Sequence, residues 1–198
     1  MTVKSILVKN FKKSADILSI KIGILGGPGS GKSTLASGIM YFAKMLDIEA
    51  ELVPEVAKWD VFAKKNMSSS GYEYDKFKRQ KSLEDKYPAS LELVICEAPL
   101  VISAIFAAFY HGDDSKVAKD MFELAHKNKG RYSHMLVVKK LGKYKDKHRN
   151  ETEGQSDTLH VKTLEILDRL EINYTVINSY HDGVPLQVLS QIGAVKKD

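Results

Sequence analysis

Glycine, lysine and serine residues between positions 26 and 33 have the spacing of a phosphate-binding loop. The segment reads Gly-Gly-Pro-Gly-Ser-Gly-Lys-Ser and matches the pattern G-x-x-x-x-G-K-[ST] at every defined position. Glycine allows backbone angles that other residues disfavour and lets the chain approach a phosphate closely. Successive backbone N–H groups can then converge on the phosphate, helped by the N-terminus of the following helix. The residues expected to bind the nucleotide are Gly26, Gly27, Pro28, Gly29, Ser30, Gly31, Lys32, Ser33 and Thr34.

Three side chains of this segment have distinct expected roles. Lys32 should bridge the β- and γ-phosphates of ATP, Ser33 Oγ should ligate Mg²⁺, and Thr34 should support the α-phosphate. The alternative is a helix-capping turn that happens to contain glycine and serine. An apolar stretch before the motif and an amphipathic stretch after it favour the phosphate-binding interpretation. ATP and Mg²⁺ are therefore the expected ligands, although the motif does not name the reaction.

Two carboxylates follow predicted strands and are candidates for chemistry beside the phosphates. Glu97 ends an apolar stretch, at the place where an acid of a phosphate-binding-loop protein faces the metal. We expect it to act on Mg²⁺ through water or to serve as a base; the alternative is a solvent-facing glutamate. Glu55 follows another predicted strand and could accept a proton from an attacking hydroxyl. The alternative for Glu55 is an acid favoured by the dipole at a helix N-terminus.

Basic residues are concentrated after the fourth predicted strand. Because that strand ends at the edge where ligands bind in a parallel sheet, residues 139–155 are predicted to form a lid over the phosphates. Arg149 is the candidate catalytic cation, since a guanidinium can clamp two oxygens of the transferring phosphoryl group. The alternative is a solvated lysine-rich loop. The cations of this run are Lys139, Lys140, Lys143, Lys145, Lys147 and Arg149.

Residues 59–87 combine helical character with many aromatic side chains, and the resemblance to kinases described below implies that this region binds the phosphoryl acceptor. Aromatic rings could stack on a base there, and a glutamine could read its hydrogen-bonding edge. Lysine and arginine side chains could contact a phosphate on the acceptor. The alternative is that several of the aromatic residues belong to the core and that the basic residues are solvated. The residues assigned to the acceptor are Lys58, Trp59, Asp60, Arg79 and Gln80.

Short apolar stretches that alternate with helical segments must position these residues. The alternation predicts an α/β fold with a five-stranded parallel sheet. Together with the phosphate-binding motif it predicts the three-layer P-loop NTPase fold, and the kinase-like form with a basic lid is what the resemblance described below implies. For residues 1–11 the sequence does not decide between an extra edge strand and a short helix. Residues 56–87 are expected to be mostly helical. The predicted strands are 20–25, 50–53, 91–96, 135–138 and 174–177, and the further helices are 32–46, 100–110, 116–127, 157–170 and 186–195.

Composition excludes several classes of protein. The 198 residues are 43% hydrophobic and 28% charged, which indicates a globular chain, expected to be one domain with residues 1–19 as an N-terminal extension. The formal charge of +5 suits an anionic ligand. The single cysteine, Cys96, excludes an internal disulfide and a cysteine-cluster zinc site. No apolar run long enough for a transmembrane helix and no signal peptide is visible, so a cytoplasmic protein with no membrane partner is expected.

Four blocks of the sequence resemble the small P-loop kinases. They are residues 26–34, Pro-Glu-Val-Ala-Lys at 54–58, Ile-Cys-Glu-Ala-Pro-Leu at 95–100, and the basic lid. Within the nucleoside and nucleotide kinase superfamily, the chain resembles the nicotinamide-riboside-kinase-like group. Members of this group are often labelled AAA-type ATPases in bacteriophage genomes. If the protein is encoded by a phage, it is expected to act in the host cytoplasm. The block at Glu97 also resembles the Glu-Arg-Ser block of deoxynucleoside kinases. Because Ala98 replaces the arginine, that family's role for arginine does not carry over.

The resemblance implies ATP- and Mg²⁺-dependent phosphorylation of a hydroxyl on a nucleoside, a nucleotide or a related metabolite. One alternative is a nucleic-acid kinase that acts on a 5′-hydroxyl or on a hydroxymethylated base in DNA, since both ends of the chain are rich in lysine. Another is an NTPase regulator without kinase activity. A GTPase is disfavoured because residues 128–131, Asn-Lys-Gly-Arg, lack the base-reading aspartate, and the length disfavours a motor ATPase. The acceptor, the base preference and the oligomeric state are not predicted.

Overall fold

The centre of the protein is a parallel β-sheet, seen here in a computed structural model that describes residues 11–14, 19–67, 69–140, 144, 150–181 and 183–197. The strand order is β3-β4-β2-β5-β6, and every adjacent pair in this sheet is parallel. This arrangement confirms the predicted α/β class and the five-stranded parallel sheet. The strands are β2 (Ile20–Leu25), β3 (Ala50–Val53), β4 (Leu93–Cys96), β5 (His134–Val138) and β6 (Tyr174–Ile177).

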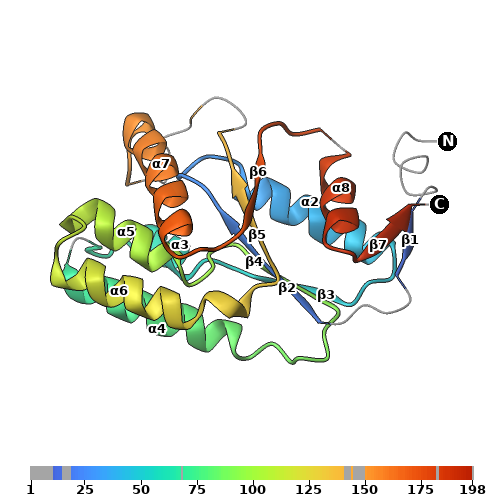
Figure 1. The fold of residues 1–198 in the computed structure, drawn as a ribbon, viewed down its shortest axis with the longest axis horizontal. Coiled ribbons are helices and arrows are strands. Elements are labelled where there is room, and N and C mark those ends of the chain that lie inside the picture. Colours follow the sequence, from blue (N-terminus) through green and yellow to red (C-terminus); the bar gives the residue numbers. More distant parts are fainter. Residues whose placement is uncertain are drawn as a thin grey trace.

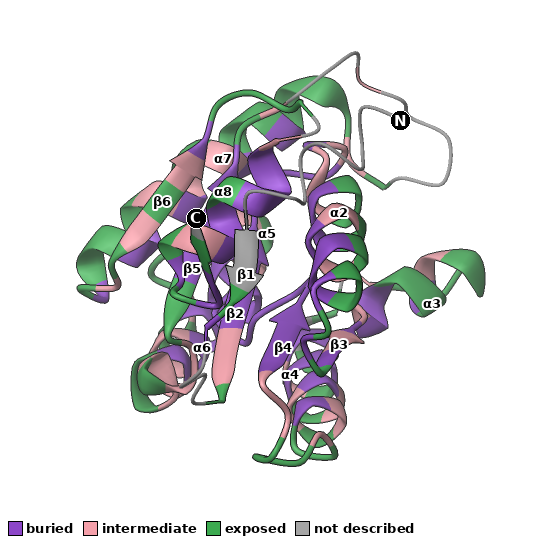
Figure 2. Ribbon diagram, turned by 90° about the vertical axis from the view of Figure 1, so that its right-hand side faces the viewer, coloured by how far each residue is buried: buried purple, intermediate pink, exposed green. Residues whose placement is uncertain are grey.

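Helices cover both faces of the sheet (Figure 1). One face packs against α2 (Lys32–Met45) and α8 (Val184–Gln191). The other face packs against α5 (Ile102–His111) and the helices around it. A sheet covered on both faces has strands that are apolar throughout, as in β4, where every residue is buried (Figure 2). The remaining helices are α3 (Val56–Phe62), α4 (Ser70–Glu84), α6 (Lys116–Lys127), the 3₁₀ turn η1 (Lys129–Arg131) and α7 (Glu153–Arg169).

The predicted helical region after β3 is interrupted. It forms α3 and α4 with a break between them, where Lys64 has a left-handed φ of 51° and three consecutive serines follow at 68–70. Helix α7 begins at Glu153, earlier than predicted and inside the range expected as a lid. A capping box explains this start, because Thr152 Oγ1 accepts from the Gln155 amide and the Gln155 side chain accepts from the Thr152 amide.

A second, two-stranded sheet joins the two ends of the described chain. Strand β1 (Phe11–Lys13) pairs antiparallel with β7 (Val195–Lys197), and Lys12 stands opposite Lys196. Residues 1–10 of the predicted N-terminal extension lie outside the described residues. At the other end, the helix predicted over 186–195 is α8, which ends at Gln191 before β7. Among the residues that the structure describes, no helix combines the length and the apolar character needed to cross a membrane.

Candidate active site

The glycine-rich loop between β2 and α2 has a backbone that only glycine adopts readily. Gly26, Gly29 and Gly31 have φ values of 141°, 78° and 106°. Helix α2 then starts without a side-chain cap and without an acidic residue in its first turn. Its first N–H groups therefore remain available for an anion, and its dipole favours negative charge at this end. Ser30 Oγ is buried and has no hydrogen-bond partner within the described structure. These features fit a bound phosphate.

Two loop glycines are also required by close packing. A Cβ on Gly26 would lie 2.4 Å from the carbonyl oxygen of Val138, at the end of β5. A Cβ on Gly27 would lie 2.4 Å from the carbonyl oxygen of Ser156 and 2.5 Å from its hydroxyl. The same hydroxyl donates a 2.7 Å hydrogen bond to the Pro28 carbonyl oxygen, and it is buried. Helix α7 therefore holds the loop from outside. Sequence reasoning missed Ser156, because nothing in its local sequence distinguishes it from other buried helix serines.

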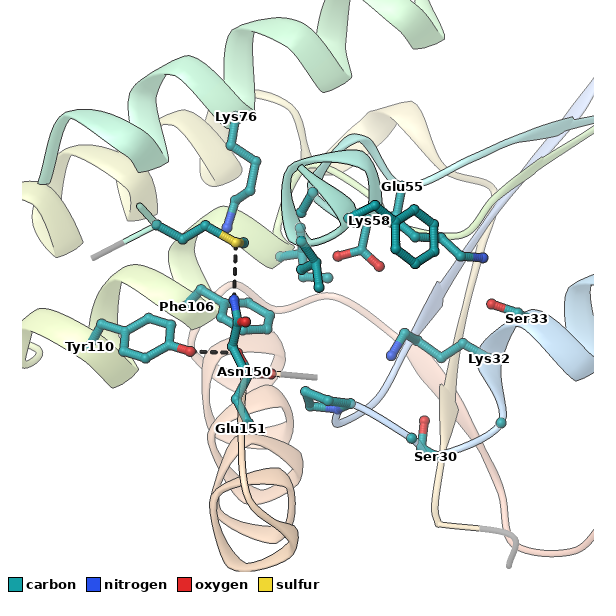
Figure 3. Close-up of a pocket in the computed structure, with 18 of the residues that line it drawn as sticks. Ser30, Lys32, Ser33, Glu55, Lys58, Lys76, Phe106, Tyr110, Asn150 and Glu151 are labelled. Carbon is teal, nitrogen blue, oxygen red and sulfur yellow. Dashed lines mark hydrogen bonds between the residues drawn. The ribbon is translucent and has the colours of Figure 1, made fainter. Parts of the chain in front are cut away.

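The side chain of Lys32 lies over the loop. Its ammonium donates hydrogen bonds to the carbonyl oxygens of Gly26, at 2.9 Å, and Gly27, at 3.1 Å. Ser33 and Thr34 follow it and are exposed. Lys32 and Ser33 both line a cavity, and Figure 3 shows them on the same side of it.

A cavity of about 690 Å³ extends from this loop to α3, α4 and α5. In Figure 3, Lys32 and Ser33 lie on one side of it and Tyr110, Asn150 and Glu151 on the other. Its size is that of a small-molecule site. Lining residues outside the loop include Glu55, Lys58, Phe62, Met67, Tyr72, Glu73, Lys76, Phe106, Tyr110, Asn150, Glu151 and Tyr180.

Glu55 lines the cavity between the two sides. It occupies the N-cap position of α3, but its side chain forms no capping hydrogen bond. The backbone at the start of α3 is held by Gln80 instead. Its Oε1 accepts a hydrogen bond from the Val56 amide at 3.0 Å, and its Nε2 donates one to the Pro54 carbonyl oxygen at 3.2 Å. Gln80 is buried and lies outside the lining of the main cavity. Its contacts hold the segment that carries Glu55.

Glu97 leaves the sheet beside the strand that enters the loop. Cys96 pairs with Gly23 of β2, and the Glu97 amide donates to the Val53 carbonyl oxygen at 3.0 Å. Glu97 is 6% exposed, and its carboxylate has no hydrogen-bond partner among the described side chains. It is not part of the cavity lining. The described residues contain no cluster of three histidines, cysteines or acids that could hold a metal ion.

Asp60 of α3 is buried and pairs with Arg79 of α4, whose side chain is 33% exposed. Arg79 Nη2 lies 2.5 Å from Asp60 Oδ2, which also accepts from the Tyr72 hydroxyl at 3.0 Å, and Lys65 Nζ lies 2.7 Å from Oδ1. Burial raises the pKa of the Asp60 carboxyl, but hydrogen bonds from Arg79, Lys65 and Tyr72 together bring this pKa below its usual value. Asp60 and Arg79 lie outside the cavity lining, as does Trp59, which is 61% exposed. Of the predicted acceptor residues, Lys58 lines the cavity.

The cavity wall contains an ion pair between Glu73 and Lys76. The sequence did not predict that these two residues act together. Lys76 Nζ lies 2.6 Å from Glu73 Oε2, and both residues line the cavity while being almost fully buried. The ammonium also lies 4.7 Å from the centre of the Phe106 ring. Burial raises the pKa of the Glu73 carboxyl, and Lys76 opposes this shift. In the sequence, a glutamate and a lysine three residues apart look like an ordinary exposed helix pair.

The predicted lid is described in part. Arg149 and the lysines at 143, 145 and 147 lie outside the described residues. Lys140 is paired with Glu153 and Asp157 at the start of α7, at 2.7 and 3.1 Å. On the cavity side, the Tyr110 hydroxyl donates to Glu151 at 2.5 Å, and Asn150 Nδ2 lies 3.1 Å from the sulfur of Met67.

The parallel sheet with helices on both faces and the glycine-rich loop after β2 define a small P-loop protein. Residues 21–182 match the model of the AAA domain family AAA_28, so the chain belongs to that family. No curated protein matches the sequence.

Several solved structures share the fold. The NadR protein in complex with NR is 14% identical with a TM-score of 0.69, over 91% of this chain and 52% of that one. The chain thus spans about half the length of NadR. Deoxyadenosine kinase from M. mycoides with bound dATP is 14% identical with a TM-score of 0.58, over 88% and 99% of the two chains. Thymidylate kinase from Candida albicans is 13% identical with a TM-score of 0.55, over 91% and 96%. At these identities the likeness establishes the fold.

Proposed function

We propose that the protein is an ATP- and Mg²⁺-dependent kinase that phosphorylates a hydroxyl of a nucleoside, a nucleotide or a related metabolite. The observation that carries this proposal is a continuous cavity that is lined by the phosphate-binding loop, by Glu55 and by aromatic side chains. A motor or a switch needs no such acceptor space beside the γ-phosphate. The nucleosides and nucleotides named for the similar structures support the same class of ligand.

In this proposal the loop amides and Lys32 bind the triphosphate. Ser33 and Glu97 would hold Mg²⁺, which when bound offsets negative charge on the phosphates. Arg149 is proposed to add a cation from the lid. Because phosphoryl transfer requires little covalent chemistry from the protein, these groups act by positioning and by charge stabilisation.

Glu55 is the proposed base. The acceptor hydroxyl oxygen forms a bond to the γ-phosphorus while the bond from that phosphorus to the β,γ-bridging oxygen breaks, and ADP leaves. The hydroxyl proton passes to the Glu55 carboxylate. Its place at the cavity wall, without a capping role for its own helix, leaves this carboxylate available for that proton.

The test is transfer of the labelled γ-phosphoryl group of ATP to a panel of nucleosides and nucleoside monophosphates. We expect a labelled product with at least one member of the panel. Lys32→Ala should lower turnover by orders of magnitude, because it removes the charge beside the transferring group. Lys44→Ala is the matched control, since Lys44 is an exposed lysine of the same helix and lies outside the cavity lining. ATP hydrolysis without any labelled acceptor would contradict the kinase and support a regulator with NTPase activity.

One observation favours the nucleic-acid alternative. The pairing of β1 with β7 brings Lys12 and Lys196, from opposite ends of the sequence, to facing positions. A DNA substrate predicts binding that weakens steeply with salt. We would therefore add hydroxyl-ended and hydroxymethylated oligonucleotides to the transfer panel and measure their binding at two salt concentrations.

A further inference from the structure

Helix α4 carries two buried glutamates with different surroundings. Glu84 is fully buried, accepts a 2.8 Å hydrogen bond from the Tyr132 hydroxyl and pairs with Arg131. Glu73 is 1% exposed, but its Oε2 has no hydrogen-bond partner within the described structure, although the ammonium of Lys76 lies 2.6 Å away. That ion pair uses only part of the capacity of the oxygen, because a carboxylate oxygen can accept more than one hydrogen bond. Glu84 is satisfied by the protein, whereas Glu73 retains hydrogen-bonding capacity at the cavity.

Lys76 retains capacity as well. An ammonium has three N–H donors, and the described contacts of Lys76 are one carboxylate and the faces of Phe106 and Tyr72. Buried polar groups are normally hydrogen-bonded, and a charged group left short of partners is costly. A ligand in the cavity that supplied both an acceptor and a donor would satisfy the pair.

The surrounding wall selects the shape of such a ligand. Phe62, Phe106 and Tyr110 line the same cavity, and Figure 3 shows Phe106 between Lys76 and Tyr110, on the side away from the loop. Aromatic side chains favour a planar ring, and a charged pair at the wall favours a ring with a polar edge. In Figure 3, Lys76 lies farther from Lys32 than Glu55 does, and Glu73 is its ion-pair partner. The part of the acceptor that does not react would lie at this end of the cavity.

We propose that Glu73 and Lys76 are the specificity-determining residues for the acceptor: together they bind the edge of a planar nitrogen heterocycle that presents an N–H donor beside a hydrogen-bond acceptor. Glu73 accepts from the ring's donor, and Lys76 donates to the neighbouring ring nitrogen or oxygen. This inference rests on the proposed function, because it concerns the acceptor of the same transfer. It narrows the acceptor to a molecule with such a base and excludes a sugar alone.

The experiment compares acceptors with and without a base. The probes are adenosine, cytidine, guanosine and uridine against methyl β-ribofuranoside, and their 5′-monophosphates against ribose 5-phosphate. For the wild-type protein we expect a KM for the best base-containing acceptor at least about tenfold below that of its base-free counterpart. Glu73→Gln and Lys76→Met should each raise the KM for the base-containing acceptor by about 10- to 100-fold, the usual effect of losing a hydrogen bond to a charged group. The KM for ATP and for the base-free acceptor should not change.

Glu84→Gln is the matched control, since it alters a buried glutamate of the same helix that lies outside the cavity lining. It should lower thermal stability without changing the KM for the acceptor. If Glu73→Gln and Lys76→Met had no larger effect on the KM for the acceptor than Glu84→Gln, the inference about Glu73 and Lys76 would be overturned. The proposed kinase function would not be affected by that result. If the variants did not fold, equal use of base-containing and base-free acceptors by the wild type would overturn it equally. Absence of transfer to any acceptor by the wild type would overturn the proposed function, and the inference with it.

Discussion

Individual residues in this protein act on the phosphate-binding loop from outside the motif. Ser156 donates to the Pro28 carbonyl oxygen, and its own backbone lies against Gly27. A carbonyl turned toward this hydroxyl points away from the expected phosphates, whose oxygens repel it. Ser156 contacts the loop and does not line the cavity, so we expect it to act as a positioning residue.

The hydroxyl of Ser156 is expected to support nucleotide affinity. Ser156→Ala leaves the buried Pro28 carbonyl without its donor, at a cost of about 1 kcal/mol, so we expect the Kd for Mg–ATP to rise by roughly fivefold. Isothermal titration calorimetry measures this change. Thr158→Ala is the control, because Thr158 lies on the exposed face of the same helix and donates to its own turn. Equal affinity in both variants would show that the loop needs no external support.

At the scale of elements, the junction of α3 with α4 carries the acceptor side of the cavity. Asp60 connects the two helices through Arg79, Tyr72 and Lys65. Gln80 fixes the chain entering α3. These contacts place two of the residues that the sequence suggested for the acceptor, Arg79 and Gln80, in supporting positions behind the cavity wall.

Loss of the Asp60 charge should destabilise the protein in a pH-dependent manner. We expect Asp60→Asn to lower the free energy of unfolding by about 2 kcal/mol at pH 7, since hydrogen bonds between charged groups are lost. The pKa of Asp60 is lowered in the folded state, so its contribution is present above the pKa of the unfolded chain and is lost as the pH falls through the folded value. The difference in unfolding free energy between Asp60→Asn and the wild type should therefore be constant between about pH 5 and about pH 7. It should shrink as the pH falls below 3.8, the ordinary pKa of an aspartate.

Urea unfolding at several pH values measures the effect, with Asp75→Asn as control. Asp75 also contacts Arg79, at 2.7 Å, but its side chain is 61% exposed. Exposed ion pairs contribute little, so this variant should lose less than about 1 kcal/mol. A pH-independent deficit in Asp60→Asn would mean that packing, and not charge, holds the junction.

The parts of the fold that the sequence predicts are those with local signals. The loop motif, the apolar strands and the amphipathic helix at 116–127 each depend on residues near one another in the chain, and the structure has them within a few residues of the prediction. The pairing of β1 with β7 depends on residues nearly the whole chain apart, and no periodicity reports it. Similarly, the sequence lists Asp60, Glu73, Lys76 and Arg79 as charged helix residues, but which of them line the cavity depends on how α4 packs against α3 and α5.

At the scale of the whole molecule, the single cysteine lies at the carboxyl end of β4, an interior strand of the sheet. Cys96 is fully buried in β4, and burial raises the pKa of its thiol. A thiol in this position reacts only when the molecule opens, because the thiolate is the reactive form. Cys96 is therefore a natural reporter of opening that includes the strands flanking the nucleotide loop.

Ligand binding should slow the reaction of Cys96. Because a ligand that binds only the folded state stabilises it by mass action, saturation with Mg–ATP at about 100 times its Kd should slow opening-limited modification by roughly 100-fold. Mass spectrometry after timed exposure to a maleimide in mild urea gives the rate. Mg–ATP should have no such effect on Lys32→Ala, and fast labelling of native protein in buffer alone would contradict the burial of Cys96.

The segment that connects β5 to α7 is flanked at both ends by residues that pack against the nucleotide loop. Val138, at its start, faces Gly26, and Ser156, after its end, faces Gly27. With both anchor points fixed, inserting residues between them costs only the slow logarithmic entropy of a longer loop, about 0.6 kcal/mol for each doubling. We therefore expect that residues inserted between these anchor points leave the geometry of the nucleotide loop unchanged. The segment between Val138 and Ser156 is therefore a suitable place to insert residues that would change the substrate preference.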